Sequence, residues 1–534
     1  MRLLFYLILT LLAIDMSGQS WPLVLDYADG STTSESVVAA DRATDGTLWM
    51  VVSYEGAHSF AGRTLPVSGG KDLALVHLDA QGDTLAVLSL TGSNDDRATD
   101  VIAMPDGGVV VVGTFRDDIA LDTITLVSAF TKSAFVVKYS NQYHAEWAHK
   151  LTGNNTLTLT GRGHAGEAGE VYVTATYGGA LDLGDTTLTA SGDTDGLLLR
   201  YNADGTRAWF YPWGRTGDTR ATCTAFGNGK LYVGGYFFGR VAIPGDTIVT
   251  NTQDEDVWLA AISPEDGAPI WLKKIGGPYA DYLIAMDTDA EGRCYLAGHY
   301  EGVLRLADGV DIQTPGFNFN WFVACYTADG TYQWVRNVGG SGLEYVGDIS
   351  VGERVLVCGT YSSAFEHDGN TLPQPPTTNG VIMRMLLDGN SSLVQEMAST
   401  NALLPTAILA ISPAAFWVAG NYRGTADFDA IQLTAPGDFF DLFVAQFDAT
   451  TVSVTGAQPE QSFMCYPNPA TDWLQIEVEC NDCTAAFYDA QGRLHYTTSE
   501  RSVDVSSWPS GVYFVRMHDS DGRPMRSVER VLVR

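Results

Sequence analysis

Four acidic residues recur at a constant distance after a glycine, and a ring of such residues could hold a cation or bind a polar ligand. They are Asp96, Asp218, Asp281 and Glu344, and they lie four residues after Gly92, Gly214, Gly277 and Gly340, respectively. A carboxylate in a tight turn can instead accept backbone N–H bonds and have no further role. Because positions that repeat usually preserve a fold, the spacing favours turn acceptors over a ligand-binding mouth.

A second set of acids and amides precedes apolar runs and has the same two interpretations. Its members are Asp72, Asp195, Asp256, Asp441, Asn320 and Asn379. Such side chains often cap turns where a strand begins. The denser acidic clusters at 254–256 and 287–291 lack the twelve-residue loop with a terminal glutamate that would make calcium a specific prediction. We therefore predict no cofactor and keep Ca²⁺ as the open alternative.

Signals for catalysis and redox chemistry are weak. The sequence has no Gly-x-Ser-x-Gly, no His-Glu-x-x-His and no phosphate-binding loop, and its nine histidines are scattered. Cys480-x-x-Cys483 fits a local disulfide or two inert thiols, because no second pair lies nearby to complete a zinc site. Cys294 and Cys325 fall on neighbouring predicted strands, where two buried thiols or a bridge are both open.

The elements that must position the acids form an internal repeat. An apolar run that ends in an aromatic residue occurs seven times, closing at residues 54, 115, 177, 237, 300, 361 and 422. These residues are 60 to 63 positions apart. A period that is so regular over most of the chain predicts a repeat architecture.

Each repeat reads as four short strands joined by turns, which together make one antiparallel sheet. Seven such sheets predict a seven-bladed β-propeller, and the recurring acids would then ring one face near the beginning of the innermost strands. The last repeat lacks a Trp-bearing fourth strand, whereas residues 21–27 match that pattern. We therefore expect residues 21–27 to complete the seventh blade and remove an open sheet edge.

The repeats resemble secreted bacterial β-propeller repeats of the SBBP type. The resemblance is carried by Trp271, Gly276-Gly277, Asp281, Asp289–Gly292 and Tyr295–Gly298, and it covers residues 21–448. Repeats two and six depart from the pattern because they lack the glycine pair or the tryptophan. The resemblance implies a secreted or surface propeller without a shared catalytic activity.

The N-terminus and the net charge indicate export and exclude some partners. Residues 1–18 have a basic start and a short apolar run, which is typical of a secretory signal peptide rather than of a membrane-spanning segment. The net charge of −32 disfavours binding to nucleic acid or to anionic membranes. We predict no integral membrane segment and assign residues 19–455 to the propeller.

Residues 456–534 break the repeat and contain short alternating strands, which predict a small immunoglobulin-like β-sandwich. This segment resembles the type A C-terminal sorting domain of the type IX secretion system. The resemblance is carried by Tyr466-Pro467-Asn468-Pro469, Tyr488–Arg493 and the strand that contains Gly511 and Tyr513. It implies interaction with the type IX machinery and delivery to the cell surface or the medium.

Two classes of function remain after these observations. The first is an exported, non-catalytic module for binding or adhesion, whose ligand is an extracellular protein or a glycan. The second is a secreted hydrolase or lyase that acts on polysaccharide with acids at the propeller mouth. A structural surface component without a specific ligand is a third, weaker hypothesis.

Overall fold

The computed structural model describes residues 20–26, 34–60, 63–128, 132–153, 157–159, 163–250, 254–314, 318–367, 370–429, 431–435, 439–448, 463–466, 470–478, 483–488, 494–518 and 524–533. Every regular element in these ranges is a β-strand, and no helix among them is long and apolar enough to cross a membrane. The described residues fall into two compact units, one within Gln19–Thr451 and the other within Val452–Arg534.

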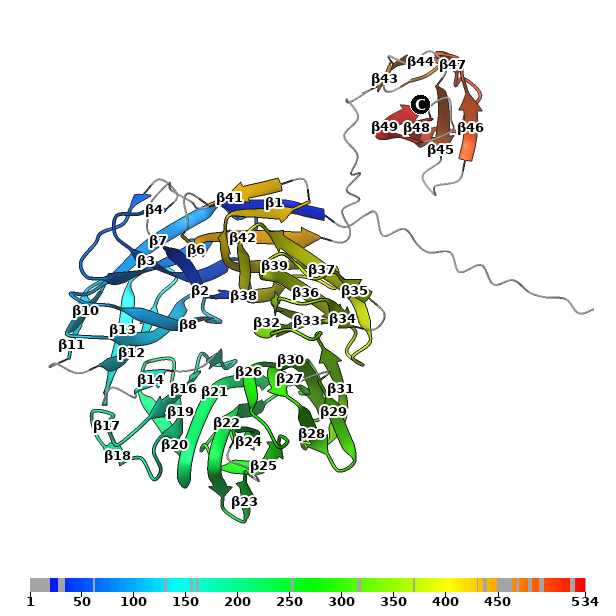
Figure 1. Cartoon of the computed structure of the whole chain (residues 1–534). Helices are drawn as coiled ribbons and strands as arrows, with labels where there is room; N and C mark the ends of the chain where they lie inside the picture. The colour runs from blue at the N-terminus through cyan, green and yellow to red at the C-terminus, as the bar shows by residue number, and fades with distance from the viewer. Residues whose placement is uncertain are drawn as a thin grey trace, which may run out of the picture. The chain divides into compact units, whose positions relative to one another are not determined.

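The larger unit is a ring of seven blades, each an antiparallel sheet built on four main strands (Figure 1). Blade 1 contains β2 (Glu35–Arg42), β3 (Leu48–Glu55), β6 (Lys71–Leu78) and β7 (Thr84–Thr91). Blade 2 contains β8 (Arg97–Ala103), β9 (Val109–Phe115), β12 (Ser133–Tyr139) and β13 (Ala145–Thr152). Blade 3 contains β14 (Thr158–Leu159) and β15 (His164–Ala165), which share the inner position, then β16 (Val171–Tyr177), β19 (Asp195–Tyr201) and β20 (Arg207–Trp213).

The other four blades follow the same order from the inside of the ring outward. Blade 4 contains β21 (Thr216–Gly227), β22 (Lys230–Ile243), β24 (Asp256–Ile262) and β25 (Pro269–Ile275). Blade 5 contains β26 (Asp281–Thr288), β27 (Cys294–Glu301), β30 (Phe319–Tyr326) and β31 (Tyr332–Val338). Blade 6 contains β32 (Tyr345–Val351), β33 (Val355–Tyr361), β36 (Asn379–Met385) and β37 (Ser391–Ser399). Blade 7 contains β38 (Ala402–Ala410), β39 (Ala415–Arg423), β42 (Asp441–Asp448) and β1 (Ser20–Asp26).

The variable stretch between the second and third strands of each repeat forms short additional strands. They are β4 (Ser59–Phe60), β5 (Arg63–Thr64), β10 (Asp118–Leu121), β11 (Ile124–Val127), β17 (Ala180–Asp182), β18 (Thr187–Thr189), β23 (Asp246–Val249), β28 (Val303–Ala307), β29 (Val310–Gln313), β34 (Phe365–His367), β35 (Asn370–Leu372), β40 (Thr425–Phe428) and β41 (Ile431–Thr434). Three of these hairpins extend the sheet of the preceding blade, since β10, β17 and β40 pair with β7, β13 and β37. Each of these three hairpins therefore links two adjacent blades.

Burial explains why the second and third strands are continuous apolar runs. All seven residues of β9 and all seven of β12 are buried, because each sheet has a neighbouring blade on both faces. The fourth strands have mostly half-buried and exposed residues, as in β20.

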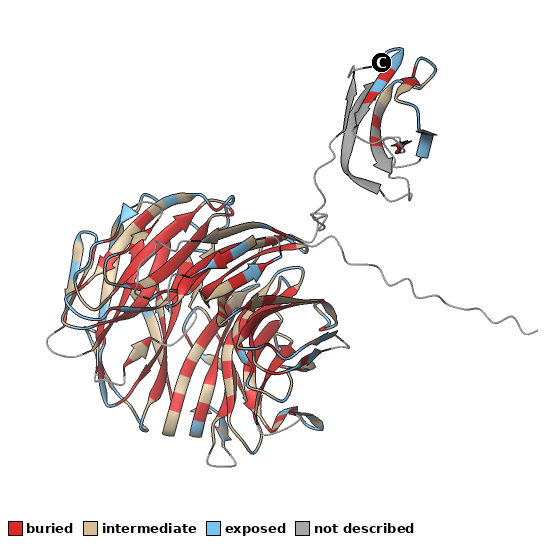
Figure 2. Cartoon of the chain, turned by 45° about the horizontal axis from the view of Figure 1, so that its top comes forward, coloured by how far each residue is buried: buried red, intermediate tan, exposed pale blue. Residues whose placement is uncertain are grey.

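Seven apolar clusters of buried residues lie between successive blades, one at each interface. Buried residues accordingly run along the strands of every blade (Figure 2). The predicted all-β, seven-bladed propeller is confirmed.

The ring closes through a strand from the N-terminal end of the propeller. β1 pairs antiparallel with β42, and Val24 lies opposite Ala445. Trp21 is 4% exposed, and its ring meets Phe416, Phe428 and Phe447 edge-on at centroid distances of 6.4, 5.2 and 5.2 Å. β1 therefore covers the edge of β42 that would otherwise be open.

The recurring tryptophans of the fourth strands connect each blade to the next. Their indole N–H groups donate to carbonyl groups in the turn of the following blade: Trp147 to Ala203 (3.1 Å), Trp209 to Pro264 (3.1 Å), Trp271 to Ala328 (3.2 Å) and Trp334 to Leu387 (3.0 Å). The ring of Trp209 also covers Gly267, which has a φ of +73° and where a Cβ atom would lie 2.6 Å from the indole. These tryptophans are part of the packing between blades.

The second unit is a small β-sandwich, as predicted. One sheet has the order β43 (Phe463–Tyr466), β44 (Trp473–Val478) and β47 (Ser502–Asp504). The other has the order β46 (Leu494–Thr498), β45 (Thr484–Tyr488), β48 (Gly511–His518) and β49 (Pro524–Val533). Both sheets contribute to one apolar cluster, which includes Leu474 and Phe487.

Two cysteine predictions can be compared with the structure. Cys294 and Cys325 are buried thiols, and the alternative of a bridge between them is wrong. Cys294 faces the core between blades 4 and 5, whereas Cys325 faces the core between blades 5 and 6, so their side chains leave the sheet on opposite faces. Cys483 is disulfide-bonded, but its pairing with Cys480 stays a prediction because Cys480 lies outside the described residues.

Candidate functional site

The four predicted acids lie at one face of the propeller, the face at which the inner strands begin. We call it the start face. Asp96 directly precedes β8, Asp218 is the third residue of β21, Asp281 opens β26 and Glu344 directly precedes β32. Three of these side chains are buried, and Asp218 is half-buried.

Three of the acids accept hydrogen bonds from neighbouring turns and strands. The N–H of Gly277 donates to Oδ2 of Asp281 at 2.8 Å, which is the turn bond that the spacing suggested. The hydroxyl of Ser363 donates to Oε1 of Glu344 at 2.8 Å, and the hydroxyl of Thr194 donates to Oδ1 of Asp218 at 3.1 Å. Their role as a ligand-binding mouth stays a prediction.

A second carboxylate faces some of these acids across the blade boundary. Burial, together with the carboxylates of Asp72 and Asp118, raises the pKa of Asp96 to about 8. Burial also raises the pKa of Asp281 well above its ordinary value, and nearby Asp256 adds to this effect. Asp256 itself is ion-paired with Lys274 at 2.8 Å. Burial at these boundaries therefore opposes the charged form of Asp96 and Asp281.

The four-residue spacing from a glycine did not identify one further acidic residue of this ring. Glu35 lies 61 residues before Asp96, is 3% exposed, and its carboxyl group contacts the imidazole of buried His58. The preceding glycine, Gly30, is five residues away instead of four. The 61-residue period alone would have found Glu35.

The raised pKa of Asp96 predicts a specific pH dependence of stability. The unfolded chain loses this proton near pH 3.8 and the folded protein near pH 8, so stability falls as the pH rises between these values. Asp96→Asn removes this titration while keeping the shape of the side chain. We expect the variant to melt within about 1 °C of the wild type at pH 5 and about 2–4 °C above it at pH 9. Thermal unfolding from pH 5 to pH 9 measures this difference, and a constant offset would contradict it; Asp83→Asn, at an exposed side chain, is the control.

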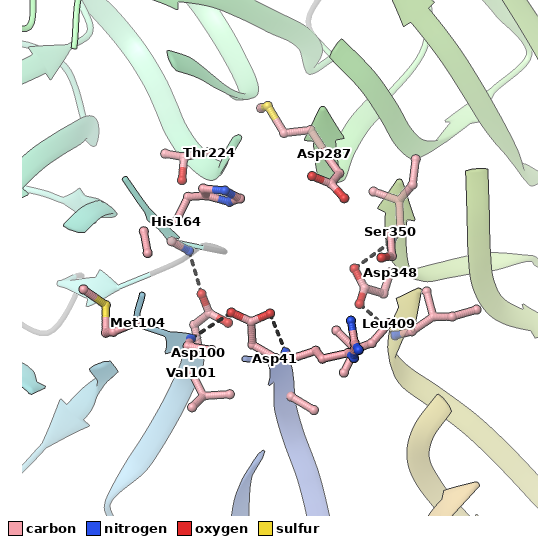
Figure 3. Close-up of a pocket in the computed structure, with 18 of the residues that line it drawn as sticks. Asp41, Asp100, Val101, Met104, His164, Thr224, Asp287, Asp348, Ser350 and Leu409 are labelled. Carbon is pink, nitrogen blue, oxygen red and sulfur yellow. Dashed lines mark hydrogen bonds between the residues drawn. The ribbon is translucent and has the colours of Figure 1, made fainter. Parts of the chain in front are cut away.

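The central channel contains a second group of acids, of which the sequence drew attention only to Asp287, within the acidic cluster at 287–291. Asp41, Asp100, Asp287 and Asp348 line a cavity of about 280 Å³ between the inner strands (Figure 3). Each accepts a backbone N–H from the inner strand region of the next blade. The donors are Ala103 to Asp41 (2.8 Å), Gly163 to Asp100 (2.6 Å), Val351 to Asp287 (2.7 Å) and Ile408 to Asp348 (2.9 Å). The edge of each inner strand that faces the channel has no neighbouring strand to pair with. These carboxylates accept hydrogen bonds from some of the backbone N–H groups along that edge.

The protonation of the titratable side chains in this cavity depends on how deeply they are buried. Burial raises the pKa of Asp287 to about 7, and the carboxylates of Asp348 and Asp41 add to the rise. Burial lowers the pKa of His164 to about 4, so the imidazole is neutral at neutral pH. Within the described ranges, no group of three or more His, Cys, Asp or Glu side chains is arranged to hold a metal ion. Calcium binding stays the open alternative that it was at the level of the sequence.

The start face also carries an aromatic cluster that spans blades 4 to 6. We define the aromatic cluster as Tyr236, Tyr282, His299, Phe319 and Tyr345. Neighbouring ring centroids are 4.8 Å apart for Tyr236 and Tyr282, 5.2 Å for Tyr282 and His299, 5.2 Å for His299 and Phe319, and 5.4 Å for His299 and Tyr345. Tyr345 is 43% exposed, and the other four are half-buried.

Polar groups surround the aromatic cluster. The guanidinium of Arg220 lies 5.6 Å from the ring centroid of Tyr236, and the hydroxyl of Tyr282 donates to Glu255 at 3.3 Å. Tyr345 also lines a cavity of about 440 Å³ at the start-face mouth of the channel, together with Thr99 and Thr222. Aromatic rings flanked by hydrogen-bonding groups can bind a ligand that is apolar on one side and polar at its edge.

Sequence reasoning missed the aromatic cluster because it treated recurring aromatic residues as core. None of the five occupies the closing position of a repeat. Phe319 and Tyr345 open β30 and β32, and Tyr282 is the second residue of β26. Aromatic residues at the first positions of inner and third strands were the signal that could have revealed them.

The residues of the predicted sorting signal are partly described. Tyr466 ends β43, whereas Pro467, Asn468 and Pro469 lie outside the described residues. Gly511 opens β48, and the hydroxyl of buried Tyr513 donates to the carbonyl of Pro509 at 2.9 Å. Their individual roles in sorting stay a prediction.

One family model matches the C-terminal part of the chain. Residues 464–531 match the secretion system C-terminal sorting domain, which confirms the prediction for this segment. The protein is therefore exported by type IX secretion to the cell surface or the medium, and its C-terminal domain interacts with that machinery. No curated protein matches the chain.

Several solved structures match the chain at low similarity. Quinohemoprotein alcohol dehydrogenase from Comamonas testosteroni is 9% identical, with 85% of this chain and 79% of that chain covered and a TM-score of 0.40. YCF48 bound to a D1 peptide is 9% identical, with coverages of 81% and 98% and a TM-score of 0.37. A protein of unknown function from Dyadobacter fermentans is 9% identical, with coverages of 81% and 99% and a TM-score of 0.35. Similarity at this level says nothing about function, and the SBBP-type resemblance of the repeats stays a prediction.

Proposed function

We propose that this exported propeller is a non-catalytic binding module that holds an extracellular glycan on its start face. The observation that carries the proposal is the aromatic cluster beside the channel mouth, with Tyr345 at its exposed edge. Sugar rings present apolar C–H faces that pack on aromatic rings, while their hydroxyl groups need polar partners. Glu255 and Arg220 are such partners at the border of the cluster.

The hydrolase or lyase hypothesis has less support from the geometry. Asp281 and Glu344 are buried at blade boundaries and accept hydrogen bonds from a glycine N–H and a serine hydroxyl. A catalytic acid has to reach the glycosidic oxygen of a bound substrate. Both residues instead stabilise the beginning of an inner strand.

The proposal predicts that Tyr345→Ala weakens glycan binding about tenfold, because one well-placed aromatic contact contributes about 1.4 kcal/mol. The mature exported protein is first screened on a glycan array, and the affinity for the best ligand is then measured for both forms. Phe439→Ala is the matched control, since Phe439 is 41% exposed and lies in blade 7 outside the aromatic cluster.

Two results would contradict this function. The first is an array without any bound glycan, or an equal loss of affinity in Phe439→Ala. The second is release of reducing ends from a polymeric substrate by the wild type but not by the double variant Asp281→Ala with Glu344→Ala. That second result would establish the hydrolase or lyase class instead.

A further inference from the structure

A group of cations converges at one place on this strongly acidic protein. The chain has 63 acidic and 31 basic residues, yet Arg97, Arg116 and Lys132 line one cavity of about 470 Å³ in blade 2. Asn94, Asp95, Thr114 and Phe115 complete its lining. We call this cavity the basic pocket.

The strand register of blade 2 brings the three cations together. Arg97 opens β8 and pairs with Thr114 of β9, two residues before Arg116. Phe115, the last residue of β9, pairs with Ser133 of β12, and Lys132 directly precedes that serine. Arg97, on β8, and Arg116 and Lys132, which directly follow β9 and precede β12, respectively, therefore lie together at the start face.

The lining of the basic pocket contains more cations than carboxylates. Asp95 is the one carboxylate in the lining of the basic pocket, and it lies 3.8 Å from Arg97 in an exposed pair. Within the described part of the chain, Arg116 and Lys132 form no ion pair, and Lys132 Nζ has a 3.5 Å contact with the hydroxyl of Thr158. Burial lowers the pKa of Lys132, and repulsion by the two guanidinium groups lowers it further. An anion placed among them would relieve this repulsion.

We propose that the basic pocket binds a carboxylate or sulfate group of an anionic polysaccharide. This inference rests on the proposed glycan-binding function and names the chemical class of the glycan. The cavity at the channel mouth links the aromatic cluster to the basic pocket. Its lining includes Tyr345 of the aromatic cluster and also Thr99, which lies two residues beyond Arg97 in β8. The net charge of −32 repels a polyanion at long range, so local complementarity at the basic pocket selects where it binds.

The test measures the affinity of the full exported protein for three polymers: polygalacturonate, dextran sulfate and neutral dextran. Binding is recorded at physiological salt, where the Debye length of about 8 Å screens the distant charges more than those in the pocket. The double variant Arg116→Gln with Lys132→Gln removes two cations from the basic pocket. The matched control is Lys230→Gln with Arg354→Gln, which removes the same charge where the second strands of blades 4 and 6 begin, at the opposite face.

We expect the pocket variant to bind at least one of the two polyanions at least tenfold more weakly, and the control variant to change less than twofold. The polymer whose affinity falls more identifies the group that is bound: polygalacturonate indicates a carboxylate, and dextran sulfate indicates a sulfate. Thermal unfolding checks that both variants are folded. If the pocket variant is not folded, Arg116→Gln alone, at an exposed side chain, replaces it.

Three outcomes would overturn the inference: no binding of either polyanion by the wild type, equal weakening in the two double variants, or equal affinity for neutral dextran. Failure of this inference is distinguishable from failure of the proposed function. If Tyr345→Ala weakens binding to a neutral glycan while no polyanion binds, the basic pocket is excluded and the glycan-binding function stands. If the pocket variant loses polyanion binding while Tyr345→Ala has no effect on any glycan, the role of the aromatic cluster is excluded.

Discussion

Replacing Trp21 with alanine is expected to lower the free energy of unfolding of the propeller by about 3–5 kcal/mol, which is the usual cost of removing a large buried aromatic side chain. Trp21 lies on β1, the strand that completes blade 7, and three phenylalanines of that blade surround its ring. The loss also weakens the attachment of β1 itself. An open edge of β42 would then be available to pair with another chain.

Two measurements check the Trp21 prediction. Chemical unfolding gives the loss of stability, and hydrogen exchange reports the opening of β42 relative to the inner strand β38. Pro22→Ala is the control, because Pro22 lies on the same strand and is exposed. A Trp21→Ala protein with wild-type stability and full protection of β42 would show that closure of the ring does not depend on this side chain.

Deleting residues 456–534 is expected to reduce the amount of protein at the cell surface and in the medium by more than tenfold, with the propeller retained in the periplasm. The reason is that the sorting domain, matched over residues 464–531, is the part that the type IX machinery recognises. The propeller is a separate compact unit, Gln19–Thr451, so the deletion removes none of its strands. Cell fractionation with detection of the propeller measures the distribution.

A folding defect and a sorting defect are separable in this experiment. The retained protein should keep the thermal unfolding of the propeller, and residues 456–534 fused to a carrier with a signal peptide should be exported. Delivery of the truncated protein to the surface at wild-type amounts would refute the assignment.

Local sequence pattern was sufficient to predict the blades. The seven apolar runs that end in an aromatic residue are the second strands of the blades, from β3 to β39, because a strand buried on both faces has to be apolar throughout. The hairpins after the second strands were not predicted, and three of them pair with the sheet of the preceding blade. Their pairing depends on a neighbouring blade rather than on local pattern.

The candidate sites could be predicted only in part. Regular spacing identified Asp96, Asp218, Asp281 and Glu344, and three of the four accept a hydrogen bond. The grouping of the channel acids, the aromatic cluster and the basic pocket escaped prediction because each of these sites combines side chains from different strands. Asp41 and Asp348, for example, line one cavity although they are about 300 positions apart in the sequence.

The order of the main strands of each blade, the number of blades and the export route follow from patterns that lie within single repeats or within the last 79 residues. Such patterns are local, since they reflect the two-residue period of a strand, the conformational preferences of turns and a contiguous sorting segment. Which side chains face each other across the channel or between blades depends on how the ring closes. Tyr236 packs on Tyr282, 46 positions further on, and Thr99 lines the same cavity as Tyr345, 246 positions further on. Sequence spacing alone does not specify either pairing.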